Sequence, residues 1–130
     1  MLFRSRSPNN GLHPAGEHLG VGGSATAPGR LVYLCGDERQ AARPVVGAKP
    51  LERWTWHHVA FIRDGDRVRI HLDGAPQPEI EARTSGAAGF EQFFFGGRSD
   101  NVDNWEGRLD EIAVFPRPLG PDELARLAAP

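Results

Sequence analysis

Residues 56–74 decide the fold of this chain, and they read WHHVAFIRDGDRVRIHLDG. Apolar residues recur at every second position in two runs, which is the period of a β-strand with one buried face. Asp64 and Gly65 stand between the runs, and an Asp-Gly pair in that place is the strongest short-range signal for a tight hairpin turn. The segment therefore predicts an antiparallel β-hairpin.

The register of the hairpin follows from the position of the turn. With the Asp-Gly pair at its centre, Phe61 lies opposite Val68 on one apolar face. The other face is half polar, and it sets His58 directly opposite His71. A slip of one residue would mix the two faces. The hairpin is therefore expected to cover a core with one side only.

Glycine and proline punctuate the rest of the chain. The sequence has 16 glycines and 11 prolines, which recur between short apolar runs, as in an all-β protein with many turns. A short helix is predicted at 120–127, because Gly120 suits the N-cap and Pro121 the first helical position. The other predicted elements are strands at 17–23 and 30–36, a brief edge strand at 45–46, a second turn at 73–74, an edge strand at 79–83, and strands at 93–97 and 108–115.

Composition limits the classes of protein to which the chain can belong. Its 130 residues favour one domain, and 39% hydrophobic with 25% charged residues is typical of a globular protein without a membrane span. The net charge of -2, with no block of like sign, disfavours nucleic acid as a partner. Cys35 is the only cysteine, which excludes an intrachain disulfide and a cysteine-based zinc site. The N-terminal residues lack the apolar stretch of a signal peptide, so none is expected in this chain.

The hairpin and the C-terminal part resemble one known family. Residues 56–74 resemble the central W-H-H-V-A … Y-x-D-G hairpin of LamG-like, concanavalin A-type jelly-roll domains. Residues 106–115 resemble the closing G-x-L-D-E-V-x-V-Y strand of that family, and residues 119–124 its A-L-S-x-E-E-I helix. The resemblance implies an all-β fold, an antiparallel jelly-roll β-sandwich with a short C-terminal helix. It also implies a single domain over residues 1–130 that lacks its first strands.

The same resemblance implies a non-catalytic binding or adhesion module of a larger exported protein, located outside the cell or in the cell envelope. Its ligand would be a glycan or an extracellular protein, and its other partners would be further domains of a longer chain. The alternatives are a domain related to glycoside hydrolases and a purely structural spacer.

Hydrolysis of a glycosidic bond needs two carboxylates that flank it. Asp110 and Glu111 are adjacent and point to opposite faces, while Glu79 and Glu81 share a face on a predicted edge strand. The chain is therefore not expected to be an enzyme. The family implies instead that Asp110 accepts backbone N–H bonds where the last strand begins.

A polar loop at residues 98–104, RSDNVDN, is the candidate site. Loops at the rim of LamG-like domains often hold calcium, and this loop is rich in hard oxygen ligands. No cofactor is required, but Asp100 and Asp103 are the residues expected to hold calcium if it binds. The loop lacks the spacing of an EF-hand, and Asx residues also favour turns by themselves. The candidate ligand-binding residues are Arg98, Asp100, Asn101 and Trp105.

Tryptophan and histidine supply two further hypotheses. Any of the three tryptophans could stack on the apolar face of a sugar if its side chain is exposed. Trp56 matches the core tryptophan of the family and is expected to be buried, so Trp105 is the one expected to contact a ligand. His58 and His71 could share a metal across the hairpin, but the sequence shows no third ligand. The alternative is two histidines on a solvated sheet face.

Overall fold

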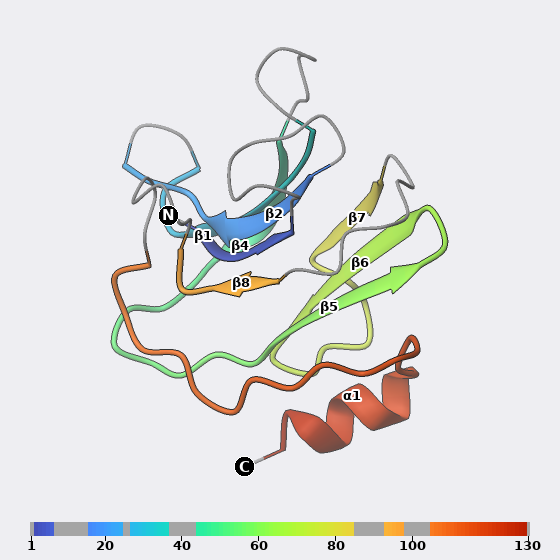
Figure 1. Ribbon diagram of the computed structural model, residues 1–130. Coiled ribbons are helices and arrows are strands. Elements are labelled where there is room, and N and C mark those ends of the chain that lie inside the picture. The colour runs from blue at the N-terminus through green and yellow to red at the C-terminus, as the bar shows by residue number, and fades with distance from the viewer. Residues whose placement is uncertain are drawn as a thin grey trace.

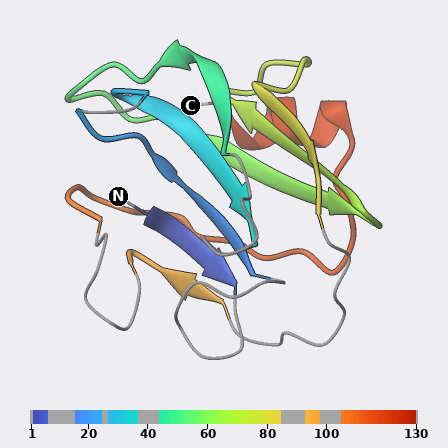
Figure 2. The same cartoon turned by 90° about the horizontal axis from the view of Figure 1, so that it is seen from above.

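Two antiparallel sheets face each other in the computed structural model (Figures 1 and 2), which describes residues 2–6, 16–24, 27–36, 44–84, 93–97 and 105–129. One sheet has the strand order β4-β3-β2-β1-β8 and the other the order β5-β6-β7. One helix, α1, lies below β5 in Figure 1. The predicted β-sandwich with a short C-terminal helix is confirmed. The elements are β1 (Leu2–Arg6), β2 (Glu17–Val21), β3 (Arg30–Cys35), β4 (Val45–Pro50), β5 (Val59–Asp64), β6 (Arg67–Leu72), β7 (Ile80–Arg83), β8 (Phe94–Phe95) and α1 (Pro121–Leu127).

The hydrophobic core lies between the sheets. Strands β2 and β3 of one sheet face β6 and β7 of the other, and the period of two sends every second side chain inward. The rings of Tyr33 and Phe61 add an aromatic contact across the interface, with their centroids 5.9 Å apart. Burial of this set holds the two sheets together. Its buried members are Leu19, Val21, Leu31, Tyr33, Val68, Ile70, Leu72 and Ile80.

The central hairpin forms, but its turn lies one residue further along the chain than predicted. Asp64 pairs with Arg67, so Gly65 and Asp66 are the central residues. Gly65 has φ +59°, and glycine at the first central position is typical of a type II′ turn. The predicted Asp-Gly turn would need positive φ at both of its central residues. In the structure Gly65 is the one central residue of the turn with positive φ, a conformation that glycine adopts without strain.

The shifted turn moves the register by two positions. Two positions are one full period of a strand, so the same side chains stay on the apolar face, and Phe61 now pairs with Ile70. The predicted pairing of His58 with His71 is wrong, because His71 pairs with Ala60. His71 is also buried, so the two histidines do not form a shared metal site on a solvated face.

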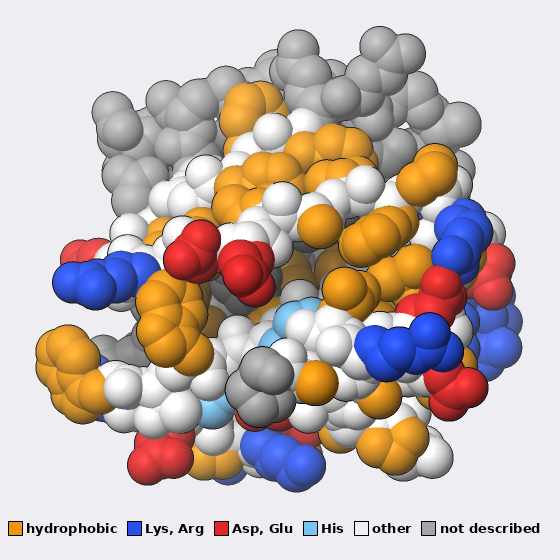
Figure 3. Space-filling model, turned by 90° about the horizontal axis from the view of Figure 1, so that it is seen from below, with side chains coloured by type: hydrophobic (Ala, Val, Ile, Leu, Met, Phe, Trp, Pro, Cys, Tyr) orange, Lys and Arg blue, Asp and Glu red, His pale blue; other side chains and the backbone are white. Residues whose placement is uncertain are grey.

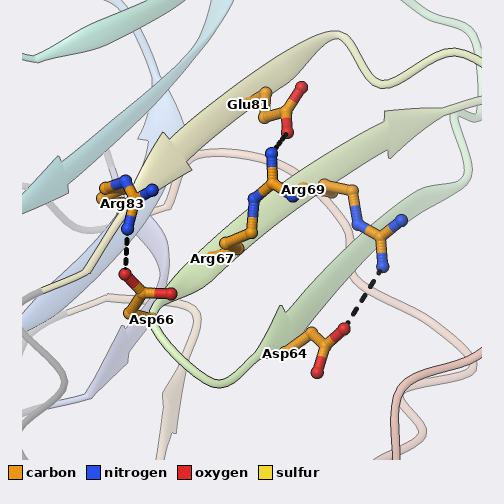
Figure 4. Close-up of polar contacts among 6 residues, drawn as sticks. All are labelled: Asp64, Asp66, Arg67, Arg69, Glu81 and Arg83. Carbon is orange, nitrogen blue, oxygen red and sulfur yellow. Dashed lines mark hydrogen bonds and ion pairs between the residues drawn. The ribbon is translucent and has the colours of Figure 1, made fainter.

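The outer face of the three-stranded sheet carries a set of ion pairs (Figure 4). Arg67 lies directly opposite Arg83, and two like charges in that position repel each other. Each guanidinium is compensated by a carboxylate: Arg67 donates to Glu81 at 2.9 Å, and Arg83 to Asp66. These side chains are all more than half exposed, so each pair contributes at most about 1 kcal/mol. Their charges also suit β7 to its place at the sheet edge.

The strand predicted at residues 108–115 does not form. In the described part of the chain this segment makes no main-chain hydrogen bond to another segment. Its apolar side chains remain exposed, with Ile112 at 52% and Val114 at 63% of full exposure. Alternating apolar residues give a strand only where a neighbouring strand supplies hydrogen bonds. The prediction is wrong because none of the described strands pairs with this segment.

The remaining predicted elements are confirmed with changes in length, and the strand predicted at 93–97 is reduced to the two residues of β8. Strand β4 runs to Pro50, further than expected, and takes the predicted edge position. The helix begins after Gly120, whose N–H donates to Glu123 Oε2 at 2.9 Å. Hydrogen bonds from Arg117 and from this N–H lower the pKa of Glu123 to about 2. Leu124 is buried and fixes the helix to the sheet, whereas Leu127 is half exposed.

Candidate functional site

A long groove of about 2410 Å³ opens between the two sheets. One wall consists of β5 and the loop before it, and the other of residues 105–119. Figure 3 shows the molecule from below, where hydrophobic side chains gather along a hollow. Phe93 and Phe95 also line the groove, and both are partly exposed. The groove is a feature of the described chain that could receive a ligand.

Two tryptophans of the loop before β5 line this groove. Trp54 is fully exposed, and its φ of +66° lies in the left-handed region that side chains rarely adopt. That conformation costs about 1–2 kcal/mol for a residue other than glycine. Trp56 is 64% exposed, so the expectation that it is buried is wrong. It is exposed because the groove is open at the point where a closed sandwich would pack against it.

Hydrogen bonds to the turn after β6 fix this loop in place. His57 Nδ1 lies 2.9 Å from Asp73 Oδ2, and His57 Nε2 lies 3.2 Å from Glu52 O. Both neighbours are hydrogen-bond acceptors for the ring. The His58 N–H donates to the other oxygen of Asp73 at 2.9 Å. Asp73 and Gly74 have φ of +52° and +67°, which confirms the predicted second turn.

The predicted site residues are only partly within the described chain. Arg98, Asp100, Asn101 and Asp103 lie outside it, and the calcium hypothesis stays a prediction. Within the described ranges, no group of three or more His, Cys, Asp or Glu residues is placed to hold a metal. Trp105 is described, and it is partly buried against the core. Its Nε1 lies 2.7 Å from the place that a Cβ on Gly107 would take, so the indole fits only because that residue is glycine.

The carboxylates considered for hydrolysis are engaged elsewhere. Glu79 Oε1 accepts the Lys49 N–H at 2.5 Å and so ties the edge strands of the two sheets together. Glu81 faces the outer surface in its pair with Arg67. Asp110 Oδ1 accepts the N–H of the next residue, Glu111, at 2.8 Å, whereas its predicted role lay at the start of a strand that does not form.

A buried polar cluster joins the two sheets. The Glu17 side chain is only 1% exposed, and its Oε1 accepts the Tyr33 hydroxyl at 3.3 Å. Arg63 Nε lies 3.6 Å from the same oxygen. Burial raises the pKa of Tyr33, and the charge of Glu17 raises it further. The cluster therefore keeps Tyr33 neutral in the folded protein.

Tyr33 is the only tyrosine, so ultraviolet absorbance follows its ionisation alone. The raised pKa means that folding favours neutral Tyr33, a contribution that is complete below about pH 10 and is lost as the pH rises above it. We expect the folded protein to contain no tyrosinate at the pH where Tyr33 is half ionised in guanidinium chloride. Circular dichroism on the same samples checks that the fold persists. Tyrosinate near pH 10 with an unchanged spectrum would contradict the burial of Tyr33.

No curated protein matches the chain. Among solved structures, the chain is similar to residues 221–444 of an S-layer domain-containing protein from Clostridium thermocellum, with 17% identity and a TM-score of 0.45. That match covers 90% of this chain and 58% of the other, so the chain spans less than two thirds of the protein it resembles. No helix in the described ranges is long and apolar enough to cross a membrane.

A family model matches residues 3–125, which is nearly the whole chain. The matched region includes both sheets and the start of α1. The superfamily that it describes contains lectins, which bind glycans, and glucanases, which cleave them. The match and the two facing antiparallel sheets lead to one conclusion: the chain belongs to the concanavalin A-like lectin/glucanases superfamily.

Proposed function

We propose that this chain is a non-catalytic module that binds a glycan, as part of a larger exported protein outside the cell or in its envelope. The observation that carries the proposal is the fully exposed indole of Trp54 on a loop fixed by hydrogen bonds. An exposed aromatic ring on a rigid loop offers contact area at a low cost in conformational entropy.

The chemistry of this loop suits a sugar ring. The apolar side of a pyranose stacks on an aromatic face, and its hydroxyl groups then need polar neighbours. Glu52, Arg53 and Asp73 line the same groove as the two tryptophans, and they offer both acceptors and donors. The strained backbone at Trp54 supports the same interpretation, because such strain gathers at binding sites.

The positions of the carboxylates favour binding over hydrolysis. Glu79 and Glu81 are held by Lys49 and Arg67, and neither lines the groove. Asp110 and Glu111 do line it, but they are neighbours in the sequence and Asp110 accepts a main-chain N–H. A retaining or an inverting glycosidase needs two carboxylates on either side of one bond.

Replacing Trp54 by alanine is the direct test. We expect the wild-type protein to bind one or more members of a glycan array, and Trp54→Ala to weaken that binding at least about tenfold, since a central aromatic contact typically contributes about 2 kcal/mol or more. Titration calorimetry with the bound oligosaccharide measures the change. Trp54→Phe, which keeps an aromatic ring, should lose less.

Val45→Ala is a matched control, because Val45 is a partly exposed apolar residue on β4 that does not line the groove. Its glycan affinity should equal that of the wild type. Equal affinity of Trp54→Ala and wild type would remove the site. Release of reducing ends from the bound glycan would contradict a non-catalytic module.

A further inference from the structure

One tight turn contacts both the loop before β5 and the C-terminal helix. It follows β6 and has Asp73 and Gly74 at its centre, and the Ala75 N–H donates to Leu72 O at 3.0 Å. Both central residues have positive φ, which is the geometry of a type I′ turn. Because a type I′ turn fixes the dihedral angles of both central residues, it also fixes the direction of the Asp73 side chain.

Asp73 holds the loop at 52–58 through hydrogen bonds to two successive residues. Asp73 Oδ2 lies 2.9 Å from His57 Nδ1, and Asp73 Oδ1 accepts the His58 N–H at 2.9 Å. The Asp73 N–H also donates to His58 O at 2.8 Å. His57 Nε2 lies 3.2 Å from Glu52 O at the other end of the loop. The Asp73 side chain therefore fixes one end of the loop directly and the other end through the His57 ring.

Helix α1 packs against the same turn. A Cβ on Gly74 would lie 2.8 Å from Ala128 Cβ, 3.7 Å from Ala125 Cα and 3.9 Å from Leu124 O. Leu124 is only 2% exposed, so the helix is held against the sheet by a buried side chain. Figure 1 shows the helix below the segment that joins β6 to β7. The helix thus lies so close to the turn that only glycine fits at position 74.

We infer that Asp73 is a positioning residue for the loop at 52–58, and that α1 holds Asp73 in place by packing on Gly74. The inference rests on the proposed glycan site at Trp54, which this loop carries. A loop that is ordered before binding gives higher affinity, because binding then costs less conformational entropy. The helix therefore raises glycan affinity through the turn and the Asp73 carboxylate.

Backbone dynamics of the whole chain test the role of Asp73 without a glycan. Asp73→Gly removes the carboxylate and permits positive φ without strain. We expect the amide order parameters of residues 53–57, from NMR relaxation, to fall from about 0.85 to below about 0.6, while those of β2 and β6 stay near 0.85. Asp73→Asn keeps an oxygen for the His58 N–H and tolerates positive φ, so it should keep the wild-type values. Unchanged order parameters in Asp73→Gly would overturn the inference.

Two glycine substitutions test the role of α1. Gly74→Ala and Gly65→Ala add the same methyl group at similar φ, +67° and +59°, but a Cβ at position 65 meets no atom within 4 Å. The backbone strain should be similar, so only Gly74→Ala, which separates the turn from the helix, should lower the order parameters of residues 53–57. Adding Ala128→Gly to Gly74→Ala removes the clashing atom and should restore them. An equal response to the two glycine substitutions, or no restoration in the double variant, would refute the role of α1.

Glycan titration connects the loop to the proposed function. Asp73 lines the groove, whereas Gly74 and Gly65 do not, so Gly74→Ala measures positioning alone. It should weaken binding of the oligosaccharide selected on the array by about tenfold, since apparent affinity falls with the fraction of molecules in the binding conformation. Gly65→Ala should bind as the wild type does.

Two outcomes of the titration separate this inference from the proposed function. Wild-type affinity in Gly74→Ala, with the loop disordered, would show that the order of the loop does not matter for binding and would overturn the inference. Absence of any glycan binding by the wild type would remove the proposed function alone, because the order parameters still decide whether Asp73 positions the loop.

Discussion

Replacing Ile70 by alanine is expected to lower the free energy of unfolding by about 2–5 kcal/mol. Ile70 is fully buried in the middle of β6, where it pairs with Phe61 on one side and Ile80 on the other. Removal of its outer carbons leaves a cavity between the two sheets that the surrounding strands can fill only in part. Urea unfolding followed by circular dichroism measures the loss.

Ile112→Ala is the matched control for this prediction. It is the same substitution at a site that is 52% exposed and outside the core, so the change should stay within about 0.5 kcal/mol. A domain of this size has a total stability of about 5–15 kcal/mol, and the alanine at position 70 could remove most of it. Ile70→Val, with an expected loss of about 0.5–1.5 kcal/mol, keeps the measurement possible. Equal losses for the two alanine variants would contradict the placement of the core.

Replacing Arg63 by alanine is expected to lower the free energy of unfolding by about 2–3 kcal/mol. This is a little less than the loss when one partner of a fully buried ion pair is removed. The Arg63 side chain is 27% exposed, but the Glu17 carboxylate that it faces is only 1% exposed. Loss of the guanidinium leaves the buried Glu17 carboxylate with less electrostatic compensation for its desolvation. Thermal unfolding at neutral pH reports the change.

Arg67→Ala is the control for the ion pair, because Arg67 and Glu81 form a pair in which both side chains are more than half exposed. It should cost no more than about 1 kcal/mol. A second variant, Glu17→Gln, removes the buried charge itself. In the background of Glu17→Gln, the replacement of Arg63 should cost much less, and a double-mutant cycle gives the difference. Additive effects would show that Arg63 acts by packing alone.

The hairpin was predictable because its signals are local. Alternating apolar residues and a turn with glycine at residue 65 specify two adjacent strands without reference to the rest of the chain. The run Asp64-Gly65-Asp66 nevertheless permits two turns, Asp-Gly and Gly-Asp, which differ in the residues that take positive φ and shift the register by two positions. The structure has the second. The sequence pattern could not distinguish them, because both keep the same apolar face.

The segment at 108–115 shows the limit of the same method. Its alternating pattern is as clear as that of β5, yet it forms no strand, because strand formation depends on a neighbour that periodicity does not reveal. The exposure of Trp56 follows from the same cause. A residue that matches a core position of the family is buried only if the part of the fold that covers it is in place.

The candidate site was also only partly predictable. Trp54 was considered for sugar stacking, but its exposure is a property of the folded loop, and the sequence carries no signal for it. The anchoring of that loop by Asp73 was missed because it depends on the register. In the observed register His58 lies opposite Asp73, and the shift by two positions had hidden this pair.

Strand β8 lies at one edge of the larger sheet and pairs with β1, although most of the sequence lies between these two strands. Arg4 meets Phe95, whereas β1 to β4 follow one another as neighbours. During synthesis the outer edge of β1 therefore stays open until roughly ninety further residues have left the ribosome, and such an edge is where a nascent chain pairs with the wrong strand. The shortest of the described strands thus sets how long a growing polypeptide is open to misassembly.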